Sequence, residues 1–316
     1  MKLVVNIPTW DEEEKIAETI KHIPRTIPGI DEIFVQIIDD GSKDKTVEKA
    51  REAGADFIFP HKTNRGIGIA FRTAVGKALG NGADIMVNID ADMQFNPQDI
   101  PKLIAPILSG DADMVSADRF GDHKAKNMPA SKYYLNRIAA WIIGRFMNYK
   151  INDLTCGFRA YNRETLLRLN LPGNFTYTQE VIIDAIGKHL KVIWIPVEVT
   201  YFNERKSRVV KSIFKYVNNS SRIILKAIRD VRPMKFFGIP GVFLIFLSLI
   251  SFGFFLYNYF PELKITQNRN YLIFGIGFFL VGLQFVIFAL IADMIKSNRK
   301  LIEDQTYLIR KEKYKK

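Results

Sequence analysis

Two long stretches without a charged side chain lie toward the C-terminal end of the sequence, and they constrain the fold more than any other feature. Residues 236–260 and 271–292 contain no Lys, Arg, Asp, Glu or His. A membrane helix needs about 20 apolar residues to cross about 30 Å of hydrocarbon, so either stretch is long enough. Two buried helices of a soluble core are the weaker alternative, because soluble helices rarely run this far without a charge. The sequence predicts a transmembrane hairpin.

The excess positive charge is confined to the same end of the chain. Residues 1–200 carry 25 basic and 26 acidic side chains, whereas residues 201–316 carry 20 and 7. A basic segment of this kind favours nucleic acid or a membrane surface as its partner, and the apolar stretches favour the membrane, so we expect no nucleic-acid partner. The connection at 261–270 holds only two basic residues, Lys264 and Arg269, while both outer flanks are rich in them. The positive-inside rule then predicts a multi-pass protein of the cytoplasmic membrane with both ends in the cytoplasm.

The first 200 residues alternate short apolar runs with helical patterns. Such alternation is typical of an α/β fold with a mainly parallel sheet that helices cover on both faces. Ligands bind these sheets at the carboxyl ends of the strands, and Asp39, Asp40, Asp90 and Asp92 follow predicted strands there. The five predicted strands lie at residues 3–7, 33–38, 55–59, 85–89 and 113–116.

Asp90-Ala91-Asp92 is the first candidate for chemistry. Two carboxylates at positions i and i+2 beyond a strand can hold one divalent ion, and hard oxygen ligands suit Mg²⁺ or Mn²⁺ shared with substrate phosphates. A solvated turn is the competing interpretation, and the strand context favours the metal site. Gly66-Ile67-Gly68 does not complete a dinucleotide fingerprint, because Phe71 stands where the third glycine is required. The single cysteine, Cys156, excludes an intrachain disulfide framework and fits a reducing compartment.

Five motifs follow one another along the chain, and their series resembles the family-two glycosyltransferases with a GT-A fold. Among these it is similar to the dolichyl-phosphate mannose synthases and the polyisoprenyl-phosphate glucosyltransferases. The resemblance covers the whole chain, because bacterial-type members also end in a two-helix membrane hairpin. The motifs are Ile7–Glu12, Ile38–Thr46, Asn64–Gly68, Asp90–Gln94 and Asp153–Tyr161.

Four segments are predicted along the chain. The resemblance implies a GT-A (Rossmann-like) catalytic domain at residues 1–208. At residues 209–232, apolar side chains recur near helical spacing with basic side chains opposite, which predicts an amphipathic interface helix. The transmembrane hairpin would follow at 233–295, and a basic cytoplasmic tail at 296–316. Because the family often forms tetramers through its membrane helices, we also expect a homo-oligomer.

The resemblance also implies roles for individual residues. Trp10 stands where the family usually has Tyr, and Lys132 and Asn136 depart from the family's Arg and Ser. For Asp153, a structural cap or strut is an equal alternative to catalysis. The implied catalytic residues are Asp92, Arg119 and Asp153. The implied metal ligands are Asp90, Asp92 and Gln94. The implied nucleotide-binding residues are Pro8, Trp10, Glu12, Asp39, Asp40, Asp90 and Ala91. The implied acceptor-phosphate residues are Lys132, Asn136, Arg137, Arg205 and Ser207.

The implied reaction moves one hexose from a nucleotide diphosphate sugar to a polyisoprenyl phosphate. The acceptor phosphate is already an anion near pH 7, so charge neutralisation by a divalent ion and basic side chains matters more than a strong base. A single displacement inverts the anomeric carbon. The sequence leaves open whether the donor is GDP-mannose, UDP-glucose or a UDP-N-acetylhexosamine.

Two alternatives remain. A processive polysaccharide synthase is disfavoured, because the sequence has no Gln-X-X-Arg-Trp segment and two spans cannot enclose a channel within one chain. A non-catalytic nucleotide-sugar-binding scaffold at the membrane is disfavoured by the intact set of Asp90, Asp92 and Gln94.

A second amphipathic stretch precedes the last motif. It is equally compatible with a membrane interface and with an ordinary core helix. Its apolar residues are Tyr134, Leu135, Ile138, Ile142, Phe146 and Met147.

Overall fold

The chain forms two compact units. Residues 1–224 and 305–316 make up the first, and residues 225–304 make up the second. The predicted acceptor residues Arg205 and Ser207, and most of the predicted interface helix, lie outside the described residues. The structure is a computed structural model that describes residues 1–121, 128, 130–170, 177–201, 221–222, 224–226, 228–262 and 265–315.

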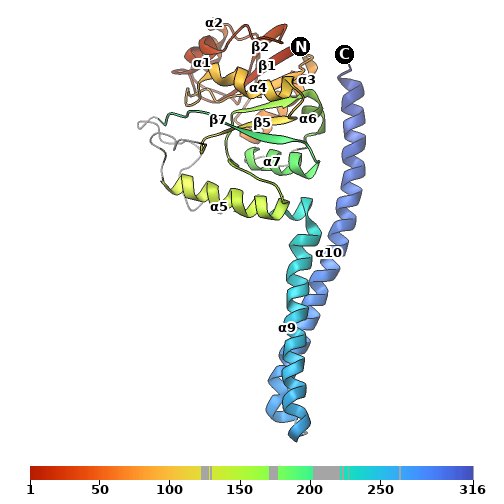
Figure 1. Ribbon diagram of the computed structural model, residues 1–316. Coiled ribbons are helices and arrows are strands. Elements are labelled where there is room, and N and C mark those ends of the chain that lie inside the picture. Colours follow the sequence, from red (N-terminus) through yellow and green to blue (C-terminus); the bar gives the residue numbers. More distant parts are fainter. Residues whose placement is uncertain are drawn as a thin grey trace. The chain divides into compact units, whose positions relative to one another are not determined.

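Within the described residues, the first unit is built on one seven-stranded sheet (Figure 1) with the strand order β3-β2-β1-β4-β6-β5-β7. Neighbouring strands are parallel except where β6 runs antiparallel to β4 and β5. The five predicted strands are present, and β6 and β7 are additional. Their bounds are β1 Lys2–Thr9, β2 Glu32–Asp39, β3 Phe57–Pro60, β4 Ile85–Asn88, β5 Met114–Asp118, β6 Arg159–Asn162 and β7 Val192–Pro196.

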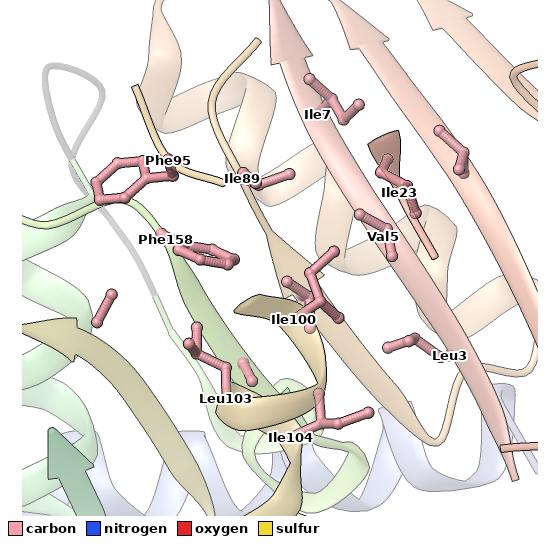
Figure 2. Packing of buried hydrophobic residues seen from close by; sticks show 14 of the residues in the cluster. Leu3, Val5, Ile7, Ile23, Ile89, Phe95, Ile100, Leu103, Ile104 and Phe158 are labelled. Carbon is pink, nitrogen blue, oxygen red and sulfur yellow. The ribbon is translucent and has the colours of Figure 1, made fainter. Parts of the chain in front are cut away.

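Helices cover both faces of this sheet, as the alternation of strands and helices predicts. Leu3, Val5 and Ile7 of β1 belong to the core cluster that α1 and α4 complete, and Figure 2 shows them beside the apolar side chains of α4. On the other face, Ala70 and Ala74 of α3 pack on Ile38. Burial of these side chains stabilises the unit by about 25 cal/mol per Å² of apolar surface. The described helices that lie wholly within this unit are α1 Ile16–His22, α2 Thr46–Glu52, α3 Ile67–Gly80, the 3₁₀ turn Pro97–Asp99, α4 Ile100–Leu108, α5 Ala130–Met147, α6 Arg163–Arg168 and α7 Thr178–Gly187.

The parallel strands bring their carboxyl ends to one edge of the sheet. In the register of β1 and β2, Thr9 pairs with Asp39, so the loops that follow these two strands start side by side. The loop after β4 begins on the other side of β1, since Asn6 pairs with Asn88. This edge therefore carries the predicted nucleotide and metal residues.

The second unit consists mainly of two long apolar helices, α9 (Pro233–Glu262) and the first part of α10 (Ile265–Lys313). Their most apolar windows have a mean hydropathy of 2.4 and 2.5, and only 17% of each window is buried. A helix in the core of a soluble protein would be mostly buried instead. Both helices therefore have the length and composition to cross a membrane as the predicted hairpin.

Small residues let the two helices approach closely. A Cβ atom on Gly282 would lie 2.9 Å from the carbonyl oxygen of Gly241, so the two backbones touch there. Farther along the pair, the Ser248 hydroxyl donates to the Gly275 carbonyl at 2.7 Å. Glycine contacts and serine hydrogen bonds of this kind hold membrane helices together where the hydrophobic effect gives no drive.

The structure is helical on both sides of the second span. Helix α9 continues to Glu262 and α10 begins at Ile265, so most of the predicted connection at 261–270 is helical. The predicted basic tail is also helical, through Lys313, and residues 305–316 belong to the first unit. There Arg310 donates to the carbonyl oxygens of Leu167 and Leu169 at 3.2 and 2.7 Å, at the C-terminal end of α6, where a cation is favourable.

Candidate active site

The loops after β1 and β2 are fastened together by hydrogen bonds. The Asp11 amide donates to the Ser42 hydroxyl at 2.9 Å, and the Glu12 amide donates to the Thr46 hydroxyl at 2.8 Å. Trp10 stands at the start of the first loop and is 42% exposed. The predicted nucleotide residue Trp10 therefore lies at the surface on a loop that a second loop holds in place.

Asp39 and Asp40 are both buried, and both bond to the chain itself. Asp39 accepts hydrogen bonds within its own turn. The Asp40 carboxylate accepts from the backbone amides of Arg65 and Gly66 at 3.0 and 2.8 Å, and it lies 2.8 Å from His61 Nδ1. Asp40 thus holds the turn that precedes α3. The other predicted nucleotide residues divide by burial: Pro8 and Ala91 are buried, and Glu12 is partly exposed.

Asp90 and Asp92 follow β4 in a tight turn, and both are partly exposed. Met93 between Asp92 and Gln94 has a left-handed backbone (φ 57°), and the Gln94 amide donates to Asp92 Oδ1 at 3.1 Å. The Gln94 carbonyl accepts from the Thr200 amide at 3.1 Å, so the turn is tied to the segment after β7.

Gly157 packs against the Asp90 carboxylate. A Cβ atom at residue 157 would lie 3.1 and 3.2 Å from the two Asp90 oxygens. Asn88 fixes this contact, because its amide donates to the Gly157 carbonyl at 3.2 Å and to the Tyr177 hydroxyl at 2.8 Å. Tyr177 is itself stacked on Phe71, with ring centroids 4.1 Å apart. Burial, and then the nearby Asp90 carboxylate, raises the pKa of the Tyr177 hydroxyl well above its usual value, so Tyr177 stays protonated.

The two carboxylates fit a divalent cation that is shared with a substrate. The absent side chain at Gly157 leaves the Asp90 oxygens next to backbone, where a larger residue would displace them. Among the described residues, no three His, Cys, Asp or Glu side chains gather into a metal site made by protein ligands alone. Mg²⁺ is commonly held by one or two carboxylates and takes its other ligands from phosphates and water. Asp90 and Asp92 match that donor set.

A buried ion pair lies just beyond the end of β5. Arg119 Nε and Nη2 donate to Asp153 Oδ2 and Oδ1 at 2.6 and 2.8 Å, and the two residues are 6% and 0% exposed. Burial alone would raise the pKa of the Asp153 carboxyl, but the Arg119 guanidinium outweighs it, and the pKa lies below its ordinary value. Burial likewise opposes the charge of Arg119, yet Asp153 raises the pKa of Arg119 well above its usual value. Both groups are therefore charged at neutral pH, and Arg119 Nη1 also donates to the Tyr201 hydroxyl at 3.1 Å.

Asp153 has several further partners. Its Oδ1 accepts from the Asn136 amide at 2.8 Å and from the backbone amides of Thr155 and Cys156 at 3.0 and 3.2 Å. A carboxylate that accepts this many hydrogen bonds is a weak base, and it holds its donors in fixed positions. The geometry favours the strut interpretation of Asp153 over the catalytic one.

One short segment connects the two parts of the site. Asp153 at its start holds Arg119, and Gly157 at its end lies against Asp90. The carboxylates after β4 and the arginine after β5 are thus positioned by the same five residues.

Of the predicted acceptor-phosphate residues, Asn136 and Arg137 have side chains that the structure describes. Asn136 is 5% exposed and donates to Asp153, so it lies behind Arg119 rather than at the surface. Arg137, next to it, is exposed. The Lys132 side chain, Arg205 and Ser207 lie outside the described residues.

Several supporting residues were missed in the sequence, among them Gly157, Tyr177 and Tyr201. Gly157 lies inside the last of the five motifs, and its position there is the one signal that pointed to it. Neither Tyr177 nor Tyr201 belongs to one of the five motifs. Each reaches the site through tertiary contacts, 87 residues from Asp90 and 82 residues from Arg119 in sequence.

Comparison with known proteins finds relatives that are named as glycosyltransferases. The chain is 29% identical over 232 residues to a dolichol-phosphate mannosyltransferase of Pyrococcus furiosus, a match that covers 71% of this chain and 64% of that enzyme. It is 29% identical over 215 residues to a UDP-N-acetylglucosamine–dolichyl-phosphate N-acetylglucosaminyltransferase of Methanococcus voltae, which covers 62% of this chain and 84% of that protein.

Among solved structures, a Mycobacterium tuberculosis glucosyl-3-phosphoglycerate synthase with Mn²⁺ and UDP superposes with a TM-score of 0.56 at 20% identity. The superposition covers 73% of this chain and 79% of that one, and it confirms the predicted GT-A fold. The family model for glycosyl transferase family 2 matches residues 4–169, which is more than half of the chain. The protein therefore belongs to glycosyl transferase family 2.

Proposed function

We propose that this protein is a membrane-anchored inverting glycosyltransferase that moves one hexose from a nucleotide diphosphate sugar to a polyisoprenyl phosphate. The observation that carries the proposal is that one chain combines a catalytic unit with a pair of helices able to span a membrane. A family-two catalytic unit presents Asp90 and Asp92 at the carboxyl edge of its sheet, and two apolar helices have the length to cross a bilayer. Relatives named for dolichyl-phosphate acceptors support the acceptor class. Because such an acceptor is dissolved in the bilayer, a hairpin that spans the membrane would keep the catalytic unit close to it.

The donor would bind along the loops after β1, β2 and β4. Trp10 offers an exposed indole on which a base stacks, and Glu12 lies in the same loop. Asp39 and Asp40 would fix the backbone of the donor site, because their carboxylates accept hydrogen bonds from backbone amides of the chain. Asp90 and Asp92 would hold a divalent ion, Mg²⁺ or Mn²⁺, which when bound neutralises charge on the leaving diphosphate.

The reaction needs little proton transfer. An anionic oxygen of the lipid phosphate attacks the anomeric carbon, the bond from that carbon to the diphosphate oxygen breaks, and the electron pair leaves with the nucleotide diphosphate. Arg119 supplies fixed positive charge beside the transferred group, where preorganised electrostatics is most effective. Asp153 and Asn136 act as positioning residues that hold Arg119.

The acceptor phosphate would approach from the membrane side. Arg137 and the basic segment that contains Arg205 and Ser207 carry the positive charge suited to it. The basic flanks of the hairpin favour a catalytic unit on the cytoplasmic face. A homo-oligomer remains a prediction.

Transfer from labelled donors tests the proposal. Full-length protein in lipid nanodiscs is incubated with polyprenyl phosphate, Mg²⁺ or Mn²⁺, and radiolabelled GDP-mannose, UDP-glucose or UDP-N-acetylglucosamine in turn. We expect label in the organic phase with one donor, and none with the Asp92→Ala variant. Absence of labelled lipid with every donor, despite nucleotide binding, would favour the scaffold alternative. A long labelled polymer would favour the processive one.

A further inference from the structure

The hydrogen bonds of Arg119 leave one corner of its guanidinium for a ligand. A guanidinium has five N–H groups, one on Nε and two on each Nη. Nε and Nη2 donate to Asp153, and Nη2 also donates to Thr155 Oγ1 at 2.7 Å. Nη1 donates to the Tyr201 hydroxyl, and its second N–H has no hydrogen-bond partner among the described residues. Nη1 is therefore the nitrogen that would donate to a substrate.

Asp153 holds only one edge of this guanidinium. Its two oxygens accept from Nε and Nη2 of Arg119 at 2.6 and 2.8 Å, and Nη1 lies at the far corner. A two-pronged contact of this kind fixes the edge that it holds. The far corner can still swing when the group tilts about that edge. The Tyr201 hydroxyl accepts from Nη1 at 3.1 Å, so Tyr201 holds the corner that would face a substrate.

The backbone before Tyr201 is anchored to the turn that follows β4. Val199 forms an antiparallel bridge with Phe95, and both residues are 5% exposed. The Thr200 amide donates to the Gln94 carbonyl at 3.1 Å. The Tyr201 ring is partly buried and packs against the main core cluster. These contacts fix the place from which the Tyr201 hydroxyl reaches Arg119.

The same turn contains one of the two carboxylates of the cation site. The Gln94 amide donates to Asp92 Oδ1 at 3.1 Å. A continuous path of hydrogen bonds and backbone thus leads from Asp92 through Gln94, Thr200 and Tyr201 to Arg119. Through this path, the position of the Arg119 guanidinium is set relative to the carboxylate that would hold the cation.

The geometry at Nη1 indicates that Tyr201 acts through Arg119. The two N–H bonds of one nitrogen diverge by about 120°, so a substrate oxygen about 2.9 Å from Nη1 would lie about 5 Å from the Tyr201 oxygen. That separation is too long for a hydrogen bond between them. Burial raises the pKa of the Tyr201 hydroxyl, and the nearby Arg119 opposes this rise only in part. Tyr201 is therefore neutral near pH 7 and is no general base.

We propose that Tyr201 is a positioning residue for sugar transfer, which holds Nη1 of Arg119 at a fixed place relative to Asp92. This role rests on the proposed function, because it concerns the charge that Arg119 supplies beside the transferred group. Without the hydroxyl, both substrates would still bind, but the positive charge would be misplaced when the bond to the sugar breaks. The loss would therefore appear in kcat rather than in KM.

A steady-state comparison of two tyrosine variants tests the proposal. Tyr201→Phe removes the hydroxyl and keeps the ring that packs against the core. Tyr149→Phe is the matched control, because that hydroxyl bonds to the amide and carbonyl of Val192 at the start of β7. Both full-length variants are assayed in nanodiscs with nucleotide sugar, divalent ion and polyprenyl phosphate. We expect Tyr201→Phe to lower kcat roughly tenfold with both KM values unchanged, and Tyr149→Phe to match the wild type.

Three results of this comparison would overturn the proposal. Wild-type kcat in Tyr201→Phe would mean that the hydroxyl does not matter for transfer. A raised KM with unchanged kcat would mean that Tyr201 contacts a substrate directly. An equal loss in Tyr149→Phe would mean that any lost hydroxyl beside β7 loosens the unit.

A double-mutant cycle with Arg119→Lys shows whether Tyr201 acts through Arg119. Lysine keeps the positive charge and has no Nη1. We therefore expect removal of the Tyr201 hydroxyl from Arg119→Lys to cause no further loss of kcat. Losses of kcat that multiply in the double variant would mean that Tyr201 acts by another route, and would overturn the proposal.

The same four proteins give a second cycle that needs no substrate. Their melting temperatures are measured in detergent. We expect Tyr201→Phe to lower the melting temperature of the wild type and to change that of Arg119→Lys much less, because the hydrogen bond is already absent there. Equal shifts in both backgrounds would overturn the pairing of Tyr201 with Arg119. Absence of transfer by the wild type with every donor would count against the proposed function, and this cycle would still decide the pairing.

Discussion

Asp153 holds the guanidinium of Arg119 in a fixed orientation, and both residues are almost fully buried. Removing one partner of a buried ion pair costs about 3–5 kcal/mol, because the other charge is left uncompensated. We therefore expect Asp153→Asn to lower the free energy of unfolding by about that amount, and to reduce sugar transfer by misplacing Arg119. Chemical denaturation of the purified protein measures the first effect, with the exposed Asp111→Asn as control. Lost transfer with unchanged stability would contradict the positioning role and indicate direct catalysis.

The same pair predicts how stability depends on pH. The pKa of Asp153 in the folded protein lies below its ordinary value of 3.8, so its ionised form favours folding. The stability advantage of the wild type over Asp153→Asn is then complete above pH 3.8 and is lost as the pH falls below that value toward the lower folded pKa. Denaturation curves of both proteins at several pH values check this. An advantage that grows as the solution is acidified would have the wrong sign.

Adding a single methyl group at Gly157 tests the cation site. In Gly157→Ala, the new Cβ would lie 3.1 Å from an Asp90 oxygen, so the carboxylate must shift. Changes beside a metal ligand typically cost about 10–100-fold in affinity or activity, and we expect a loss in that range in the Mg²⁺ or Mn²⁺ dependence of transfer. Gly76→Ala is the matched control, since its nearest neighbour would be an ordinary 3.7 Å away. Identical metal titrations for both variants would mean that Asp90 is not a ligand of the metal ion.

At the level of elements, the contact between α9 and α10 depends on two glycines. Gly282→Leu would place a side chain where the Gly241 carbonyl now lies 2.9 Å from an ideal Cβ. Overpacking of this kind costs about 1–3 kcal/mol, so we expect a lower thermal stability of the hairpin in detergent. Gly253→Leu should have little effect, because nothing lies within 4 Å of that position. Equal melting temperatures for the two variants would contradict the packing.

The strands differ in how well their sequences predicted them. Strands β1 to β5 carry short apolar runs that give a clear signal. Strand β7 carries a comparable run, Val192–Ile195, that the prediction did not use. Strand β6 has no such run: it is four residues long and starts with Arg159, which is fully buried and bonds to the Thr178 and Leu154 carbonyls. Its place between β4 and β5 is set by pairing with distant strands, which local sequence does not encode.

On the scale of the whole molecule, the parts of the site that strand topology dictates were predictable. Parallel strands end at one edge, so Asp39, Asp40, Asp90 and Asp92 were expected there. The pairing of Arg119 with Asp153 spans 34 residues and is a tertiary contact that spacing alone does not reveal. For the same reason the end of α10, predicted as a tail, was not expected to contact α6.

The proposed function requires that this chain moves one hexose onto a lipid phosphate with the help of Asp92. The most direct measurement is the mass spectrum of the lipid recovered after full-length protein, donor, divalent ion and polyprenyl phosphate react in nanodiscs. We expect a new lipid that is heavier than the acceptor by a single sugar residue. We expect this lipid to be absent with Asp92→Ala, although that variant stays folded. An unchanged acceptor mass with every donor, or the same product from Asp92→Ala, would contradict the proposed function.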